Sequence, residues 1–258
     1  MQYKIILEAC HYGYRNQSPA VKEYYESKQM WELHLLLKTE LEKYGFFVAT
    51  TRDVQEKDLA VVKRGRAAKG YDLFISLHSN AVGGSKGGNV NRVDVYTAYD
   101  NLNNAHELGQ ILVKAISECM GVDAGNSKTR KSEKGDYEYY GVLRGARSVG
   151  CPLYYIIEHS FHTNEYAARW LMLQENLLRL AKIEAAAIAA YFGVKKEFEL
   201  GDINMDGKLD SIDVMLIKRA YFGTLTLTDE QKRLADINAD GEIDIFDYLA
   251  AKRKYFKG

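Results

Sequence analysis

Two histidines and two glutamates of this chain stand where a metal ion could be held and a water molecule activated. His11 follows a short apolar segment, His78 and Glu158 each end one, and Glu26 precedes an amphipathic run. Two imidazoles and one carboxylate are ligands of catalytic zinc, which keeps a fourth tetrahedral position for water. A second carboxylate can accept a proton from that water. These residue types predict one catalytic Zn²⁺ and a hydrolytic reaction.

The two carboxylates differ in how strongly their positions point to function. Glu158 directly follows the apolar segment 153–157, where burying an unpaired carboxylate is costly. Glu26 is a weaker signal, because acidic residues are common at helix starts. On position alone, Glu23 is an equal candidate for the metal ligand.

A scaffold must bring these distant side chains together. Apolar segments predict strands at 3–7, 46–51, 73–77, 93–97 and 153–157. Helical patterns predict helices at 26–44, 103–120 and 164–192, the last as one long helix or a broken pair. This alternation predicts an α/β fold with a mostly parallel twisted sheet flanked by helices. Loops that follow the carboxyl ends of such strands converge at one edge, where the polar residues would meet.

The composition excludes several classes of protein. The chain has 258 residues, of which 47% are hydrophobic and 27% charged, as in a globular protein. Its 35 Lys and Arg residues balance 35 Asp and Glu residues, so no overall field draws it to nucleic acid. No stretch approaches the roughly 18 apolar residues of a membrane span, so we expect no membrane insertion. Cys10, Cys119 and Cys151 have no CxxC spacing, so we expect core or free thiols.

A repeat marks the last part of the chain. The segment 201–213 returns 34 residues later as 235–247. Each copy has Asp or Asn at loop positions 1, 3, 5, 9 and 12 and Gly at position 6, the pattern of an EF-hand calcium loop, although position 12 of an EF-hand is Glu. The repeat predicts two structural Ca²⁺ ions, held by Asp202, Asn204, Asp206, the Lys208 carbonyl, Asp210 and Asp213, and by Asp236, Asn238, Asp240, the Glu242 carbonyl, Asp244 and Asp247.

The order of motifs between residues 3 and 192 resembles the zinc-dependent N-acetylmuramoyl-L-alanine amidase family (Amidase_3) of autolysins and phage endolysins. The chain departs from that family at residues 8–10, where Asp-Pro-Gly is expected, and at Tyr12, where Gly is expected. The motifs that carry the resemblance are His11, Glu26 with Leu37 and Leu41, the segments 45–52 and 72–80, Val142-Leu143-Arg144, Pro152, and the segment 158–164.

This resemblance implies a site and a reaction. His11, Glu26 and His78 would hold one zinc ion, and Glu158 would be the catalytic carboxylate. Glu26 is favoured over Glu23 because it has leucines at the family's offsets. The implied reaction is hydrolysis of the amide bond between N-acetylmuramic acid and the L-alanine of the stem peptide in peptidoglycan.

A tyrosine-rich stretch, 137–140, follows the basic residues Lys128, Arg130 and Lys131. It could line a groove for glycan and acidic stem peptide, or form a solvated loop.

The repeated loops, each followed by a helical pattern, resemble the type I dockerin, a module that binds cohesins. The resemblance covers residues 200–256 and implies a cohesin-bearing scaffold protein as partner. The implied partner-binding residues are the loop pairs Ser211-Ile212 and Ile245-Phe246 and the helix pairs Lys218-Arg219 and Lys252-Arg253.

We therefore expect a zinc amidase domain at 1–194, a short linker at 195–199 and a dockerin-like calcium-binding domain at 200–258. The expected function is peptidoglycan hydrolysis of endolysin or autolysin type, at the bacterial cell wall outside the cell. The first residues show no signal peptide, so phage-type release or a trimmed leader is expected. The alternatives are a zinc peptidase or deacetylase acting on another substrate, and a non-catalytic wall-binding protein.

Overall fold

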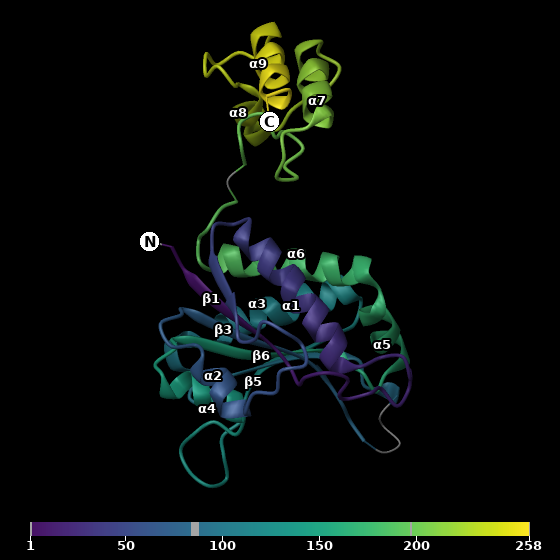
Figure 1. Cartoon of the computed structure of the whole chain (residues 1–258), viewed down its shortest axis with the longest axis vertical. Coiled ribbons are helices and arrows are strands. Elements are labelled where there is room, and N and C mark those ends of the chain that lie inside the picture. The colour runs from purple at the N-terminus through teal and green to yellow at the C-terminus, as the bar shows by residue number, and fades with distance from the viewer. Residues whose placement is uncertain (1, 84–87, 197, 258) are drawn as a thin grey trace. The chain divides into compact units, whose positions relative to one another are not determined.

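The computed structural model describes residues 2–83, 88–196 and 198–257. It divides the chain into two compact units, Met1–Lys195 and Lys196–Gly258 (Figure 1). Glu197, inside the linker predicted at 195–199, lies outside the described residues. No helix among the described residues is long and apolar enough to cross a membrane.

A six-stranded sheet forms the centre of the first unit, in the order β2-β1-β3-β6-β4-β5. All neighbouring strands in it are parallel except β4 and β6, so the predicted mostly parallel sheet is confirmed. The strands are β1 (Lys4–Ala9), β2 (Phe47–Thr50), β3 (Leu73–Asn80), β4 (Arg92–Thr97), β5 (Asp123–Thr129) and β6 (Leu153–Phe161).

Helices cover both faces of this sheet. The first face carries α1 (Glu26–Glu42), α3 (His106–Met120) and α6 (Gln174–Tyr191), and the second carries α2 (Val61–Arg66) and α4 (Gly141–Ser148) (Figure 1). The short η2 (Leu102–Asn104) precedes α3, and α5 (Glu165–Met172) precedes α6. The 164–192 pattern is therefore a broken pair of helices.

Alternation along the strands decides which side chains reach which face. Leu7 packs in the larger core beneath α1, α3 and α6, whereas Ile6 packs in the smaller core beneath α2 and α4. Phe74 also belongs to the smaller core, so Ser76 and His78, two and four residues later on β3, point to that same face. Functional side chains at the strand ends are thereby placed on one side of the sheet.

Two glycines allow α2 and α4 to touch. A Cβ atom added to Gly65 would lie 1.9 Å from the Val142 carbonyl oxygen, and one added to Gly145 would lie 2.3 Å from the Val62 carbonyl oxygen. Both distances are far below van der Waals contact, so the helices pack backbone against backbone. This contact supports α4, whose first residue, Gly141, lines a pocket together with His11 and His78.

In the second unit, α7 (Ser211–Tyr221), α8 (Asp229–Ala235) and α9 (Ile245–Tyr255) enclose a small core of Ile203, Ile217, Leu227, Leu234, Ala235 and Ala251. The two longer helices begin in the same way. Asp210 and Asp213 form a capping box at α7, and Asp244 and Asp247 form its counterpart at α9. The sequence repeat is therefore a structural repeat.

The glycine contact generates a stability prediction. Gly145→Ala should destabilise the first unit by about 2 kcal/mol or more, because the new methyl group overlaps the α2 backbone, and this cost exceeds the gain in helix propensity. Both tryptophans, Trp31 and Trp170, lie in the first unit, so urea unfolding followed by tryptophan fluorescence reports on that unit alone. The control is Lys63→Ala on the exposed side of α2, expected to change stability by less than about 0.5 kcal/mol. An unchanged urea midpoint for Gly145→Ala would contradict the packing argument.

Candidate metal centre

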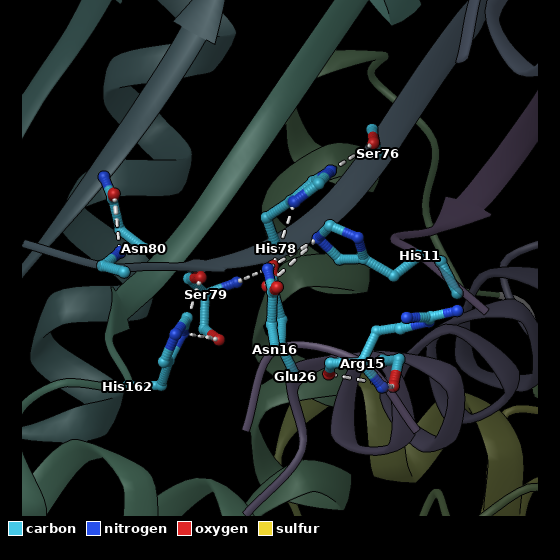
Figure 2. A network of polar contacts seen from close by, with 12 residues as sticks. His11, Arg15, Asn16, Glu26, Ser76, His78, Ser79, Asn80 and His162 are labelled. Atoms are coloured by element: carbon cyan, nitrogen blue, oxygen red, sulfur yellow. Dashed lines mark hydrogen bonds and ion pairs between the residues drawn. The ribbon is translucent and has the colours of Figure 1, made fainter. Parts of the chain in front are cut away.

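His11, Glu26 and His78 lie together where β1 and β3 end and α1 begins (Figure 2). His11 Nε2 is 3.3 Å from one carboxylate oxygen of Glu26, and His78 Nδ1 is 3.0 Å from the other. Both rings point toward Glu26 (Figure 2). Glu26 is 1% exposed. Glu23 is exposed, so of the two glutamates weighed from the sequence, Glu26 is the one beside the histidines.

The side chains of His11, Glu26 and His78 face one another around one place. The Asn16 amide donates to Glu26 Oε2 at 2.6 Å and lies 2.9 Å from His11 Nε2, which therefore presents a lone pair to that N–H. Burial opposes ionisation of Glu26, but its hydrogen bonds with His11 and His78 hold its pKa well below the ordinary value. Burial alone would lower the pKa of His78, but the bond to Glu26 raises it to about 9. The site therefore favours positive charge between these groups.

The donor set fits zinc. The ligand atoms of Cys10, His11, Glu26 and His78 all lie within 4.8 Å of one another. Two imidazole nitrogens and a carboxylate are a ligand set of catalytic zinc sites. Burial raises the pKa of the Cys10 thiol well above its ordinary value and favours its protonated form, which leaves His11, Glu26 and His78 as the donor set. These three residues could hold one metal ion and leave a position free for water.

A buried hydrogen-bond chain orients His78, and sequence reasoning missed it. The Ser76 hydroxyl donates to Glu8, and Ser76 Oγ lies 3.1 Å from His78 Nε2. Figure 2 shows Ser76 beside the His78 ring. Because its only proton goes to Glu8, Ser76 must accept the Nε2 proton of His78, which leaves Nδ1 to face Glu26. Arg64 donates to Glu8 at 2.9 Å and neutralises that buried carboxylate. When His78 is neutral, as a metal ligand must be, this hydrogen-bond chain keeps its proton on Nε2 and leaves Nδ1 free for the metal.

The loop between β1 and α1 is held in an uncommon conformation. His11 has φ 52° and Asn16 φ 54°, in the left-handed region that residues other than glycine seldom adopt. The Asn16 carbonyl accepts a hydrogen bond from the Glu26 amide at 3.0 Å, and Ser27 accepts one from the Arg15 amide at 2.8 Å. These bonds fasten the loop to the start of α1. Each strained residue costs about 1–3 kcal/mol, so the surrounding contacts must outweigh that strain.

Glu158 lies beside this cluster on the neighbouring strand. It is paired in register with His78 across the parallel β3 and β6, so the two side chains point to the same face. Neighbouring strands are separated by about 4.8 Å. Its Oε2 atom is buried and has no hydrogen-bond partner among the described residues, and burial raises the pKa of Glu158 to about 7. A carboxylate in this state can accept a proton from a water molecule near His78.

The next residue, His159, points to the opposite face. Its Nδ1 lies 3.0 Å from the His78 carbonyl oxygen and its Nε2 lies 3.0 Å from Glu184 of α6. Both side chains are fully buried. His159 thus connects the main chain of His78 to α6, and it does not reach the metal cluster.

A pocket of about 160 Å³ opens beside the cluster. His11, His78, Tyr140 and Gly141 line it, together with Arg64 and Glu8. Substrate could therefore approach the two histidines from the side of α4.

The second unit places its two acidic loops in matching conformations. The first aspartate of each loop, Asp202 or Asp236, accepts hydrogen bonds from two loop amides at 2.8–3.1 Å. The last aspartate, Asp213 or Asp247, is fully buried and also accepts from loop amides. Among the described residues, no three acidic groups of these loops approach one another as closely as the His11 cluster does. The predicted partner-binding residues on α7 and α9, 211–212, 218–219, 245–246 and 252–253, are all exposed.

Comparison with known families agrees with this division of the chain. The N-acetylmuramoyl-L-alanine amidase family (Amidase_3) matches residues 5–190. The type I dockerin domain family matches residues 200–254. A search of the curated proteins gives no match.

Several solved structures share the fold of the first unit. Cwp6 from Clostridium difficile is 23% identical, with a TM-score of 0.64 over 74% of this chain and 29% of Cwp6. The catalytic domain of CwlV, an N-acetylmuramoyl-L-alanine amidase from Bacillus (Paenibacillus) polymyxa var. colistinus, is 18% identical, with a TM-score of 0.61 over 75% of this chain and 100% of that one. The CwlD amidase from Clostridioides difficile, solved in complex with the GerS lipoprotein, is 19% identical, with a TM-score of 0.63 over 75% and 100%. At these identities the likeness concerns the fold.

The hydrogen-bond chain to His78 predicts a dependence of metal affinity on Ser76. Ser76→Ala removes the acceptor of the Nε2 proton, and we expect zinc affinity to fall by about 10-fold or more. Competition with a chromophoric chelator measures this, with Ser148→Ala, an exposed serine of α4, as the control. Equal affinity in Ser76→Ala and the wild type would show that His78 needs no such support.

Proposed function

Because the chain belongs to the zinc-dependent N-acetylmuramoyl-L-alanine amidase family and carries a C-terminal type I dockerin domain, we propose that His11, Glu26 and His78 are its zinc ligands and Glu158 its catalytic carboxylate. The chain is a peptidoglycan hydrolase of that family. The observation that carries the residue assignment is the meeting of three distant donors beside a buried carboxylate with an unpartnered oxygen.

The chemistry divides between the ion and the protein. Zinc held by the three ligands would polarise the scissile carbonyl and lower the pKa of a water molecule from 15.7 to about 7. Glu158 Oε2 accepts a proton from the attacking water and delivers it to the nitrogen of the departing L-alanine. The amide C–N bond breaks, the lactyl group of N-acetylmuramic acid becomes a carboxylic acid, and the stem peptide leaves with a free amine. Glu158 returns to its starting state.

The protein supplies orientation for this reaction. Ser76 and Glu8 keep His78 Nδ1 directed at Glu26, and Asn16 does the same for Glu26 Oε2. Burial excludes bulk water from Glu158, so its proton is exchanged with the reacting groups.

The dockerin domain directs where the amidase acts. We propose that it binds a cohesin-bearing scaffold through the exposed pairs Ser211-Ile212 and Ile245-Phe246, with Lys218-Arg219 and Lys252-Arg253 beside them. We also propose that its two loops each bind one structural Ca²⁺. An enzyme so equipped would act on the cell wall from outside the cell, in the manner of an autolysin or an endolysin.

Glu158→Gln tests the proton transfer. The amide is similar in size and cannot accept the water's proton, so turnover should fall by at least about 100-fold. Zinc content, measured by elemental analysis, should stay at the wild-type level because Glu158 is not a ligand. The assay counts L-alanine amino termini freed from purified sacculi. Normal release of these termini by Glu158→Gln would rule out the assigned role, and release of other termini by the wild type would rule out the amidase bond.

Calcium tests the second unit. Protein stripped of divalent cations and reloaded with zinc alone should lose helical signal in far-ultraviolet circular dichroism and regain it on addition of calcium, because each loop gathers like charges. Tryptophan fluorescence should not respond, since Trp31 and Trp170 lie in the first unit. A double variant, Asp202→Ala with Asp236→Ala, serves as the calcium-insensitive control. Helicity that is the same with and without calcium would refute a structural role for the ion.

A further inference from the structure

A recess of about 670 Å³ lies on the loop between β5 and α4. Three basic side chains, Arg130, Lys134 and Arg144, line it together with the rings of Tyr137 and Tyr139. Glu133 is the acidic residue of its lining. The recess is therefore positively charged in a chain whose formal net charge is zero.

The neighbouring cations are already neutralised, whereas those of the recess are not. Lys128 pairs with Asp94, Lys131 with Asp136, and Arg147 with Asp100. Within the described part of the chain, no carboxylate pairs with Arg130, Lys134 or Arg144. Three unpaired cations around one hollow favour an anionic ligand.

The recess is held open by contacts of its own loop. The amide of Ser132 donates to the Tyr137 carbonyl at 2.9 Å, and the amide of Tyr139 donates to the Arg130 carbonyl at 3.0 Å. Arg144 donates to the carbonyls of residues 138 and 139 at 2.9 and 2.7 Å. The Arg130 guanidinium lies 3.5 Å from the centre of the Tyr139 ring, which keeps the guanidinium in place. A ligand would meet cations that are already positioned.

Tyr140 connects this recess with the pocket of the metal centre. Tyr140 lines the pocket that contains His11 and His78. Its ring centre lies 5.1 Å from that of Tyr139 and 5.9 Å from the Arg130 guanidinium carbon. A peptide whose first amide bond reaches the histidines can extend past Tyr140, since an extended chain advances about 3.3–3.6 Å per residue.

We propose that this recess binds a carboxylate of the stem peptide, on a residue beyond the L-alanine at the cleaved bond. The proposal rests on the proposed function for the position of that bond. A neutral sugar would need only the tyrosine faces, whereas the unpaired cations call for a negatively charged group. The recess therefore selects stem peptides whose acidic groups are free over those in which they are amidated.

Binding of the product peptide tests this without any turnover. The probes are two synthetic stem peptides with a free L-alanine amino terminus, identical except that the carboxylates are free in one and amidated in the other. Calorimetry with the zinc-loaded full chain should show the free acid binding about fivefold or more tightly. In Arg130→Gln and in Lys134→Gln this preference should fall toward one. Lys182→Gln, an exposed cation on α6, should keep the wild-type preference. Arg144 is left intact because it holds the loop.

Each result decides the matter. Equal affinity of the wild type for the two peptides, or an unchanged preference in both recess variants, overturns the proposal. Equal weakening of both peptides in both variants leaves the preference unchanged and overturns the proposal in the same way. Tighter binding of an oligomeric glycerol phosphate than of the acidic peptide would assign the recess to a phosphate polymer and would also overturn it. Release of L-alanine termini from sacculi, measured separately, reports on the proposed function alone.

Discussion

A single buried carboxylate decides how the catalytic unit is built. Glu26 faces two imidazole nitrogens, and this arrangement favours a positive charge between the three groups. The surrounding structure serves this arrangement. The strained loop at His11 and Asn16 is fastened to α1, and the donors Asn16 and Ser79 hold both carboxylate oxygens. Folding therefore prepares a binding site for a cation before any substrate arrives.

The sheet allows residues far apart in sequence to supply that site. Glu8, Ser76 and His78 share one face because each lies an even number of residues from Ile6 or Phe74 on its strand. Glu158 joins them through the register of β6 with β3. Glu26 comes from a helix on the other face and meets the others only where the strands end. The reaction can thus take place at the edge of the rigid sheet, where a large polymer such as peptidoglycan can approach.

Some residues of the site and most strands could be predicted from local sequence patterns, whereas other residues and elements left no such pattern. His11, His78 and Glu158 adjoin apolar runs, and such positions can be recognised without a structure. Ser76 lies inside a strand and Glu8 near the end of another, so their contact appears only once the β1–β3 register is known. Likewise α2 and α4 escaped prediction because the glycines that let them touch lower helix propensity. The edge strand β5 escaped because it is polar and largely exposed.

The contact between His159 and Glu184 means that substitutions far from the proposed zinc ligands can lower activity. The side chains of His159 and Glu184 are both fully buried beneath α6. Through His159 they hold the main chain of His78, a proposed zinc ligand, on the face of the sheet opposite to its side chain. Removing either partner would leave the other buried without its hydrogen bond, at a cost of about 1–3 kcal/mol, and would weaken the link between α6 and the main chain of His78. Loss of activity in a random mutant library should therefore map partly to α6, which lies on the opposite face of the sheet from the pocket of the metal centre.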